Sequence, residues 1–135
     1  MTASDLVVLD THVWVWWVSQ DERLPAVLRE RIDAAGHVAV SAVSVYELVQ
    51  AVGRGRLRLT LALDVWLESA TVEAKAEIVP VDFRIAKRAA GLPQVHGDPM
   101  DRLIIATALE HGSQLVSQDG KFSGYPELAG VLISQ

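Results

Sequence analysis

The sequence predicts an α/β fold in which a parallel β-sheet is covered by helices on both faces. Short apolar runs rich in Val, Leu and Ile recur along the chain. Segments with apolar residues at helical spacing lie between nearly all of them. A run that is apolar at every position is typical of a strand buried on both faces. Strands that alternate with helices favour right-handed crossovers and therefore a parallel sheet.

Five strands and six helices are expected in chain order. The strands are LVVL at residues 6–9, HVAV at 37–40, EIVPV at 77–81, QLVS at 114–117 and a weaker VLI at 131–133. The helices are expected over residues 11–19, 24–36, 44–51, 61–74, 83–90 and 98–111. Thr11, Asp82 and Asp98 are the expected N-caps, and glycines follow several of the expected helix ends, among them Gly36, Gly91 and Gly112.

Length and composition exclude several classes of protein. A chain of 135 residues with 50% apolar content suits one compact domain, here residues 1–135. The absence of cysteine excludes a disulfide scaffold, a thiolate metal site and a cysteine nucleophile. A net charge of −5 disfavours a protein that holds nucleic acid by bulk basic charge, but not one that cuts it with carboxylates and a metal.

Targeting signals are not apparent in the sequence. The apolar runs are far shorter than the ~18 residues that a membrane span needs. Residues 1–5 contain no Lys or Arg, whereas a secretory signal peptide would carry a positive charge there. We therefore expect a cytoplasmic protein of bacterial type with no membrane association.

Four carboxylates are expected to meet at the carboxyl edge of the sheet. Asp10 follows the first strand, and Glu47 lies in the helix after the second. Asp101 opens the helix that leads into the fourth strand, and Asp119 follows that strand. Two like charges 4 Å apart repel by roughly 4 kcal/mol at an effective dielectric constant near 20. A divalent cation cancels that repulsion, and oxygen ligands suit Mg²⁺ or Mn²⁺, which activate water at a phosphodiester.

Each acid also fits a purely structural role. Ser44 and Glu47 have the spacing of a capping box, and the Asp98–Asp101 pair resembles one. Asp119 precedes Gly120, as in many turns. Only the joint placement of all four acids favours a site over separate caps and turns.

Four ordered segments carry a specific resemblance. They are LDTHVWVWW at residues 9–17, SAVSVYEL at 41–48, HGDPMDRLIIATA at 96–108 and LVSQDGKF at 115–122. Together they resemble the motifs of PIN-domain proteins, most closely the VapC-type toxins of bacterial toxin–antitoxin pairs. The resemblance extends from Leu6 to about Tyr125, which is nearly the whole chain.

The resemblance implies a fold, an activity and a partner. The fold would be a three-layer PIN-like domain with strand order 3-2-1-4-5. The activity would be an endoribonuclease dependent on Mg²⁺ or Mn²⁺, with RNA as substrate. The partner would be a cognate antitoxin, and the chain would assemble as a homodimer or as a hetero-oligomer with that antitoxin.

Site residues follow from the resemblance by position. The metal-binding and catalytic acids would be Asp10, Glu47, Asp101 and Asp119, with Asp98, Thr11, Ser117 and Arg102 in support. Ser117 stands where the family usually has Thr and keeps the hydroxyl. Arg102 would pair with a site carboxylate, contact RNA phosphate or form a surface ion pair.

Basic and aromatic residues outside the motifs' acids leave alternatives open. Arg54, Arg56 and Arg58 suit either a solvated loop or a contact with phosphate or an acidic partner segment. His12 suits either packing at a helix start or a role in the site. Three tryptophans within residues 14–17 cannot all face one side of a helix, so at least one should face outward. Together with the apolar stretch at residues 45–52, they predict a groove for a partner helix.

Two rival functions remain at this stage. One is a catalytically silent PIN-fold interaction protein that keeps its acids for stability. The other is an aspartyl-phosphate enzyme of the haloacid dehalogenase type with Asp10 as nucleophile. That second family requires another Asp two residues further on, where this chain has His12.

Overall fold

A five-stranded parallel sheet forms the centre of the molecule. The computed structural model describes residues 5–93 and 98–134. The strands are β1 (Leu6–Leu9), β2 (His37–Ser41), β3 (Ala76–Val79), β4 (Gln114–Val116) and β5 (Leu132–Ile133). They lie in the order β3-β2-β1-β4-β5, and every neighbouring pair is parallel. The predicted fold class and strand order are thereby confirmed.

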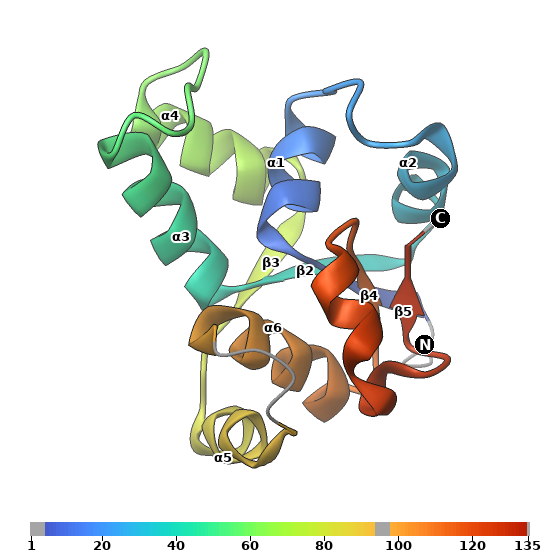
Figure 1. Ribbon diagram of the computed structural model, residues 1–135. Coiled ribbons are helices and arrows are strands. Elements are labelled where there is room, and N and C mark those ends of the chain that lie inside the picture. Colours follow the sequence, from blue (N-terminus) through green and yellow to red (C-terminus); the bar gives the residue numbers. More distant parts are fainter. Residues whose placement is uncertain (1–4, 94–97, 135) are drawn as a thin grey trace.

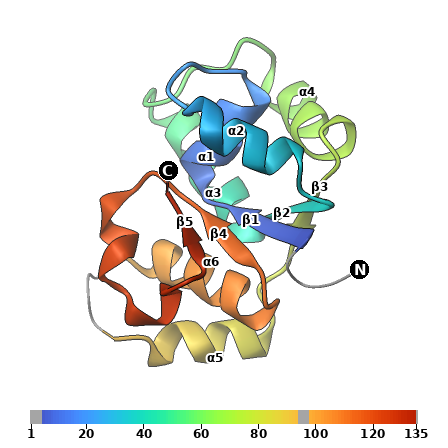
Figure 2. The ribbon, with the colours of Figure 1, turned by 90° about the vertical axis from the view of Figure 1, so that its right-hand side faces the viewer.

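Helices cover both faces of this sheet (Figures 1 and 2). They are α1 (Thr11–Val18), α2 (Ala26–Asp33), α3 (Ala42–Gly53), α4 (Leu63–Glu68), α5 (Phe83–Gly91) and α6 (Pro99–Glu110). A π-helical turn, η2 (Ser69–Glu73), continues α4, and two short 3₁₀ helices, η3 (Gly120–Gly124) and η4 (Pro126–Leu128), follow β4. Figure 2 shows α1, α2 and α4 above the sheet and α5 and α6 below it.

Alternation along β1 divides the core into two halves. Val7 and Leu9 pack with Trp14 and Leu28 on the side of α1 and α2. Val8 faces the opposite side, where α5, α6 and the 3₁₀ helices pack. Successive strand residues point to opposite faces, so an apolar run such as LVVL supplies both halves. All three of these β1 residues are fully buried.

Several helix boundaries differ from those predicted. Asp10, not Thr11, is the N-cap of α1, because Asp10 is still extended and its carboxylate accepts from the Val13 amide at 2.8 Å. β2 continues through Ser41, which caps α3, so α3 begins two residues earlier than expected and Ser44 lies buried inside it. Ser44 and Glu47 therefore do not form a capping box.

Other boundaries have equally local causes. α2 ends at Asp33 with Ala34 as its C-cap, before Gly36 is reached. The expected strand 77–81 stops at Val79, ahead of Pro80, which has no amide hydrogen for the ladder. Asp82 and Asp98 are N-caps as predicted, accepting from the amides of Ile85 and Met100.

The expected helix over residues 61–74 is shorter and changes its winding. In an α-helix the Ala74 amide would donate to Ala70, but it donates to Ser69 at 3.0 Å. The Ala70 carbonyl is thereby released, and the indole N–H of buried Trp14 donates to it at 3.1 Å. The wide turn thus joins η2 to α1 across the core.

Two expectations involve residues outside the described ranges. The third motif begins with His96 and Gly97, which lie outside the described residues. Residues 1–4, where a signal peptide would begin, also lie outside them. Within residues 5–93 and 98–134, no helix is both long and apolar enough to cross a membrane.

Candidate functional site

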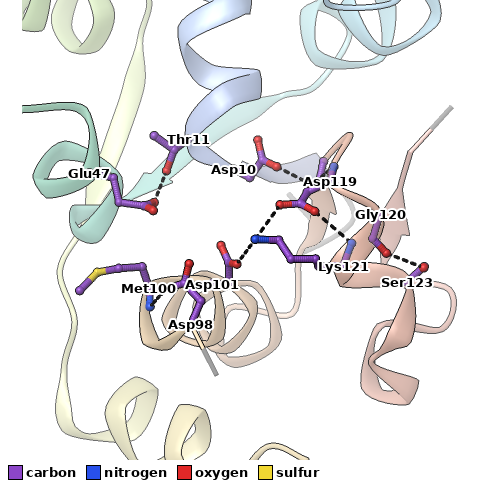
Figure 3. Close-up of polar contacts among 11 residues, drawn as sticks. Asp10, Thr11, Glu47, Asp98, Met100, Asp101, Asp119, Gly120, Lys121 and Ser123 are labelled. Carbon is purple, nitrogen blue, oxygen red and sulfur yellow. Dashed lines mark hydrogen bonds and ion pairs between the residues drawn. The ribbon is translucent and has the colours of Figure 1, made fainter. Parts of the chain in front are cut away.

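The carboxyl ends of β1 and β4, the first turn of α6 and the middle and later turns of α3 border one cleft. Its volume is about 370 Å³. All four predicted acids line it, together with the supporting residues Asp98 and Thr11. Figure 3 shows these acidic side chains, from four separate segments, around a common space.

Three of the carboxylates form a compact group. Glu47, Asp98 and Asp101 each offer an oxygen, and these oxygens lie within 4.8 Å of one another. Asp98, expected to be a cap, therefore caps α6 and also belongs to the group. Asp10 and Asp119 line the same cleft without being part of this three-carboxylate group.

A hydroxyl orients each of two acids. Thr11 Oγ1 lies 2.6 Å from Glu47 Oε1 and 2.8 Å from Ser44 Oγ. Because a carboxylate can only accept, the Thr11 hydroxyl proton belongs to the bond with Glu47. Fully buried Ser117 donates to Asp10 Oδ2 and accepts from the Asp119 amide at 3.0 Å. The supporting positions Thr11 and Ser117 thus contact the acids directly.

Burial makes the charged form of these acids costly. Asp10 is 5% exposed, and its burial raises the pKa to about 6 from the usual 3.8, against the opposing effect of its bonds from Ser117 and Val13. Burial also raises the pKa of Asp101 to about 6, and the Asp98 charge adds to this effect. The pKa of Glu47 is raised for the same two reasons, burial first.

Lys121 partly offsets this repulsion. Its Nζ lies 3.3 Å from Asp101 Oδ2 and 3.4 Å from Asp119 Oδ2, so one ammonium group bridges two acids (Figure 3). The negative charge of Asp101 is the main cause of a raised pKa at Lys121. Sequence reasoning missed this residue, although a cation two positions after a predicted site acid was a usable signal.

Arg102 does not join the acids. Its side chain is buried and donates to the carbonyl oxygens of Pro93 and Leu92 at 2.8 and 2.7 Å, and more weakly to that of Ala90. The guanidinium therefore holds the end of α5 against α6. Of the three roles left open by the sequence, neither a pair with a site carboxylate nor a surface ion pair is found among the described residues, because the guanidinium donates to backbone carbonyl oxygens instead.

Comparison with known proteins places this arrangement in a family. The model of the PIN domain matches residues 7–128. The chain belongs to the PIN domain family. Over 120 residues it is 35% identical to "Ribonuclease VapC22" of Mycobacterium tuberculosis. The aligned region covers 88% of this chain and 91% of that relative.

Solved structures share the PIN fold over nearly the whole chain. VapBC2 of Rickettsia felis, bound to a promoter DNA fragment, matches with a TM-score of 0.69 at 17% identity, covering 95% of this chain and 97% of that chain. DNA-bound VapBC of Salmonella typhimurium matches with a TM-score of 0.65 at 20% identity, covering 94% and 96%. FitAcB of Neisseria gonorrhoeae matches with a TM-score of 0.64 at 21% identity, with the same coverage.

Neutralising Asp101 should stabilise the metal-free protein. The raised pKa means that the folded state binds more protons than the unfolded state between pH 3.8 and about 6, so the stability contributed by this carboxyl is lost as the pH rises through 6. At pH 7 we expect Asp101→Asn to gain about 1 kcal/mol, after allowance for solvent screening and the lost charge at the helix start. The gain should disappear towards pH 4.

Thermal melts in chelator at pH 7 and pH 4 measure this effect. Asp82→Asn, which neutralises an exposed N-cap outside the cleft, is the matched control. Because Asn caps a helix about as well as Asp, this variant should gain no stability at either pH and should lose only the favourable charge at the helix start at pH 7. An Asp101→Asn protein that is less stable than wild type at pH 7 would contradict the repulsion described here.

Removing the Lys121 ammonium should have the opposite effect. Its side chain is 52% exposed, so we expect Lys121→Met to lose only about 0.5 kcal/mol of metal-free stability at pH 7. Lys87→Met, on the exposed side of α5, is the control and should change little. Equal melting temperatures for the two variants in chelator would show that the bridge contributes nothing.

Proposed function

We propose that the chain is a metal-dependent endoribonuclease and the toxin of a toxin–antitoxin pair. The observation that carries the proposal is the three-carboxylate group, whose oxygens converge beside a bridging ammonium in an open cleft. Membership of the PIN family and the 35% identity to a protein named a ribonuclease support the same activity.

The donor set suits a hard divalent cation. The group contains only carboxylate oxygens, which are the ligands that Mg²⁺ and Mn²⁺ prefer over softer metals. Lys121 shows that a positive charge is already favoured at this position. We propose Glu47, Asp98 and Asp101 as the main ligands, with Asp10 and Asp119 completing the site.

Five residues at the cleft have defined parts in the proposed reaction. When bound, a divalent ion would supply an activated water and offset the charge of the phosphodiester. Thr11 and Ser117 fix the carboxylates of Glu47 and Asp10, so that their geometry is set before RNA enters. A cleft carboxylate would take the proton of the attacking water as its oxygen bonds to phosphorus and the bond from phosphorus to the leaving sugar oxygen breaks. The leaving oxygen would take a proton from solvent. Lys121 remains close enough to contact a phosphate oxygen.

The alternative of a catalytically silent interaction protein receives less support. Three buried or half-buried carboxyls have raised pKa values, which means that their ionised forms lower the stability of the fold at neutral pH. A domain kept only for interaction would gain stability from neutral residues there. Acids with raised pKa values that gather in a cleft are typical of functional sites.

A protein partner is also part of the proposal. One matched structure, from Klebsiella pneumoniae, is described as a toxin–antitoxin complex. On α3 of this chain, Tyr46 and Val49 are 57% and 39% exposed, whereas Trp14 is fully buried and unavailable. We propose that an antitoxin helix covers this α3 surface and that the pair operates in the cytoplasm.

Cleavage should require the acids. With Mn²⁺ or Mg²⁺ and a mixed RNA substrate, we expect Asp10→Asn and Asp101→Asn each to lose at least about a hundredfold in rate while remaining folded. Asp33→Asn, which removes a carboxylate charge outside the cleft but keeps an oxygen to accept from the Trp17 indole, should keep full activity. Chelator should abolish cleavage by wild type. Full cleavage by both folded site variants would overturn the assignment of the acids.

Expression alone should slow bacterial growth. Co-expression with a small protein encoded beside this chain should restore growth, and Asp101→Asn should be harmless without it. Growth curves after induction, with protein amounts checked by immunoblot, measure both effects. Harmless expression of active wild-type enzyme would remove the toxin part of the proposal and leave the nuclease part standing.

A further inference from the structure

The cleft that contains the acids also has a basic and aromatic wall. His12, Trp16, Arg23, Arg54 and Arg56 line it, in addition to the acids and Lys121. Four of the 12 Lys and Arg residues of a chain with net charge −5 thus border this one cleft. Basic groups attract the phosphates of a nucleic acid. Placed beside the carboxylates, they would hold its backbone next to the proposed metal site.

In this wall Arg23 lies over the ring of Trp16, and the two side chains together are called the Trp16–Arg23 surface. The Arg23 Cζ atom lies 5.5 Å from the centre of the Trp16 indole, within the range of a cation–π contact. On α1, His12 lies one turn before Trp16, and their ring centres are 5.8 Å apart. Trp16 is six residues after Asp10, which places this surface about 9 Å along the helix from the acids.

The position of Arg23 is fixed by its neighbours. Asp21 accepts from Arg23 Nε at 3.1 Å and from Nη2 at 2.7 Å, and it also accepts from the Arg23 amide. Arg29 in turn donates to the carbonyl oxygens of Trp16, Trp17 and Asp21, which ties this loop to the end of α1. Arg23 has five N–H donors, of which Asp21 takes two, so donors remain for a ligand.

Arg54 and Arg56 extend the wall beyond the end of α3. Both are exposed, and within residues 5–93 and 98–134 neither side chain forms a hydrogen bond or ion pair. Their charges are therefore available to a ligand. Arg58, two residues further on, does not line the cleft and provides a natural comparison.

We propose that this wall is a subsite for single-stranded RNA, in which a base next to the cleaved phosphodiester stacks on the Trp16–Arg23 surface and Arg54 and Arg56 bind flanking phosphates. The inference rests on the proposed nuclease function. Unpaired bases stack on aromatic rings and guanidinium planes, whereas bases within a duplex are already stacked. Most side chains that line the cleft are charged or polar, which favours RNA over an apolar partner helix.

Fluorescence anisotropy with labelled RNA oligonucleotides tests the stacking surface. The Asp101→Asn protein serves as the parent, so that RNA is bound without being cut. Trp16→Leu should weaken binding of single-stranded RNA about tenfold, and Trp16→Phe, which keeps an aromatic ring, should restore most of it. Arg23→Ala, at an exposed position that does not threaten folding, should weaken binding as well. Duplex RNA of the same sequence should bind less tightly.

Trp17→Leu is the matched control. Trp17 neighbours Trp16 in sequence but donates to Asp33 and does not line this cleft, so its removal should leave RNA affinity unchanged. Equal affinity of the Trp16→Leu and Trp17→Leu proteins overturns the stacking surface. Unchanged RNA binding combined with loss of a co-expressed protein partner also overturns it, and assigns the wall to that partner.

The salt dependence of binding tests the arginines separately. Arg54→Gln and Arg56→Gln should each lower the slope of log K against log salt concentration by about 0.7. Arg58→Gln should leave the slope unchanged, and equal slopes for all three variants overturn the phosphate contacts. Wild-type cleavage measured in parallel separates the two levels of inference. Cleavage without these effects removes only the subsite, whereas absent cleavage and absent RNA binding remove the nuclease function too.

Discussion

The repulsion among carboxylates at the end of a parallel sheet is the constraint on which the rest of the site depends. Three of these acids are also N-caps: Asp10 of α1, Asp98 of α6 and Asp119 of η3. Their oxygens accept backbone amide hydrogens, and the positive ends of the helices favour a negative charge there. The same side chains therefore start helices and line the cleft. Cap and site were competing interpretations of the sequence, but in the structure they are two uses of one carboxylate.

Much of the fold could be predicted because it depends on local patterns. The fully apolar run at β1, the largely apolar run at β2 and the Asp82 and Asp98 caps indicate their own structure. Boundaries failed where tertiary contacts decide. The spacing of Ser44 and Glu47 suggests a cap at Ser44, but β2 continues through Ser41, which caps α3 instead. The π turn after α4 depends on the Trp14 indole from a segment 56 residues away.

The convergence of the four acids on one cleft could be predicted, but the positions of the other groups could not. Strand ends bring Asp10 and Asp119 to one edge, which spacing alone suggests. That Asp98 joins Glu47 and Asp101 depends on how α6 packs against α3, and that Lys121 bridges two acids depends on the 3₁₀ helix after β4. Arg102 was misplaced because its sequence position beside Asp101 says nothing about the end of α5, which it holds.

The charges of the cleft are divided by function. The acids line one part of the cleft, where a divalent ion would offset their repulsion. Arg23, Arg54 and Arg56 line the wall, where a phosphate backbone would pass. We propose that the three-carboxylate group binds the metal. A crystal structure with Mn²⁺, examined by anomalous scattering, tests it most directly. We predict an anomalous peak coordinated by Glu47, Asp98 and Asp101, with Lys121 displaced from Asp101. A cleft without a peak at saturating Mn²⁺, in which Lys121 still bridges Asp101 and Asp119, would contradict the account.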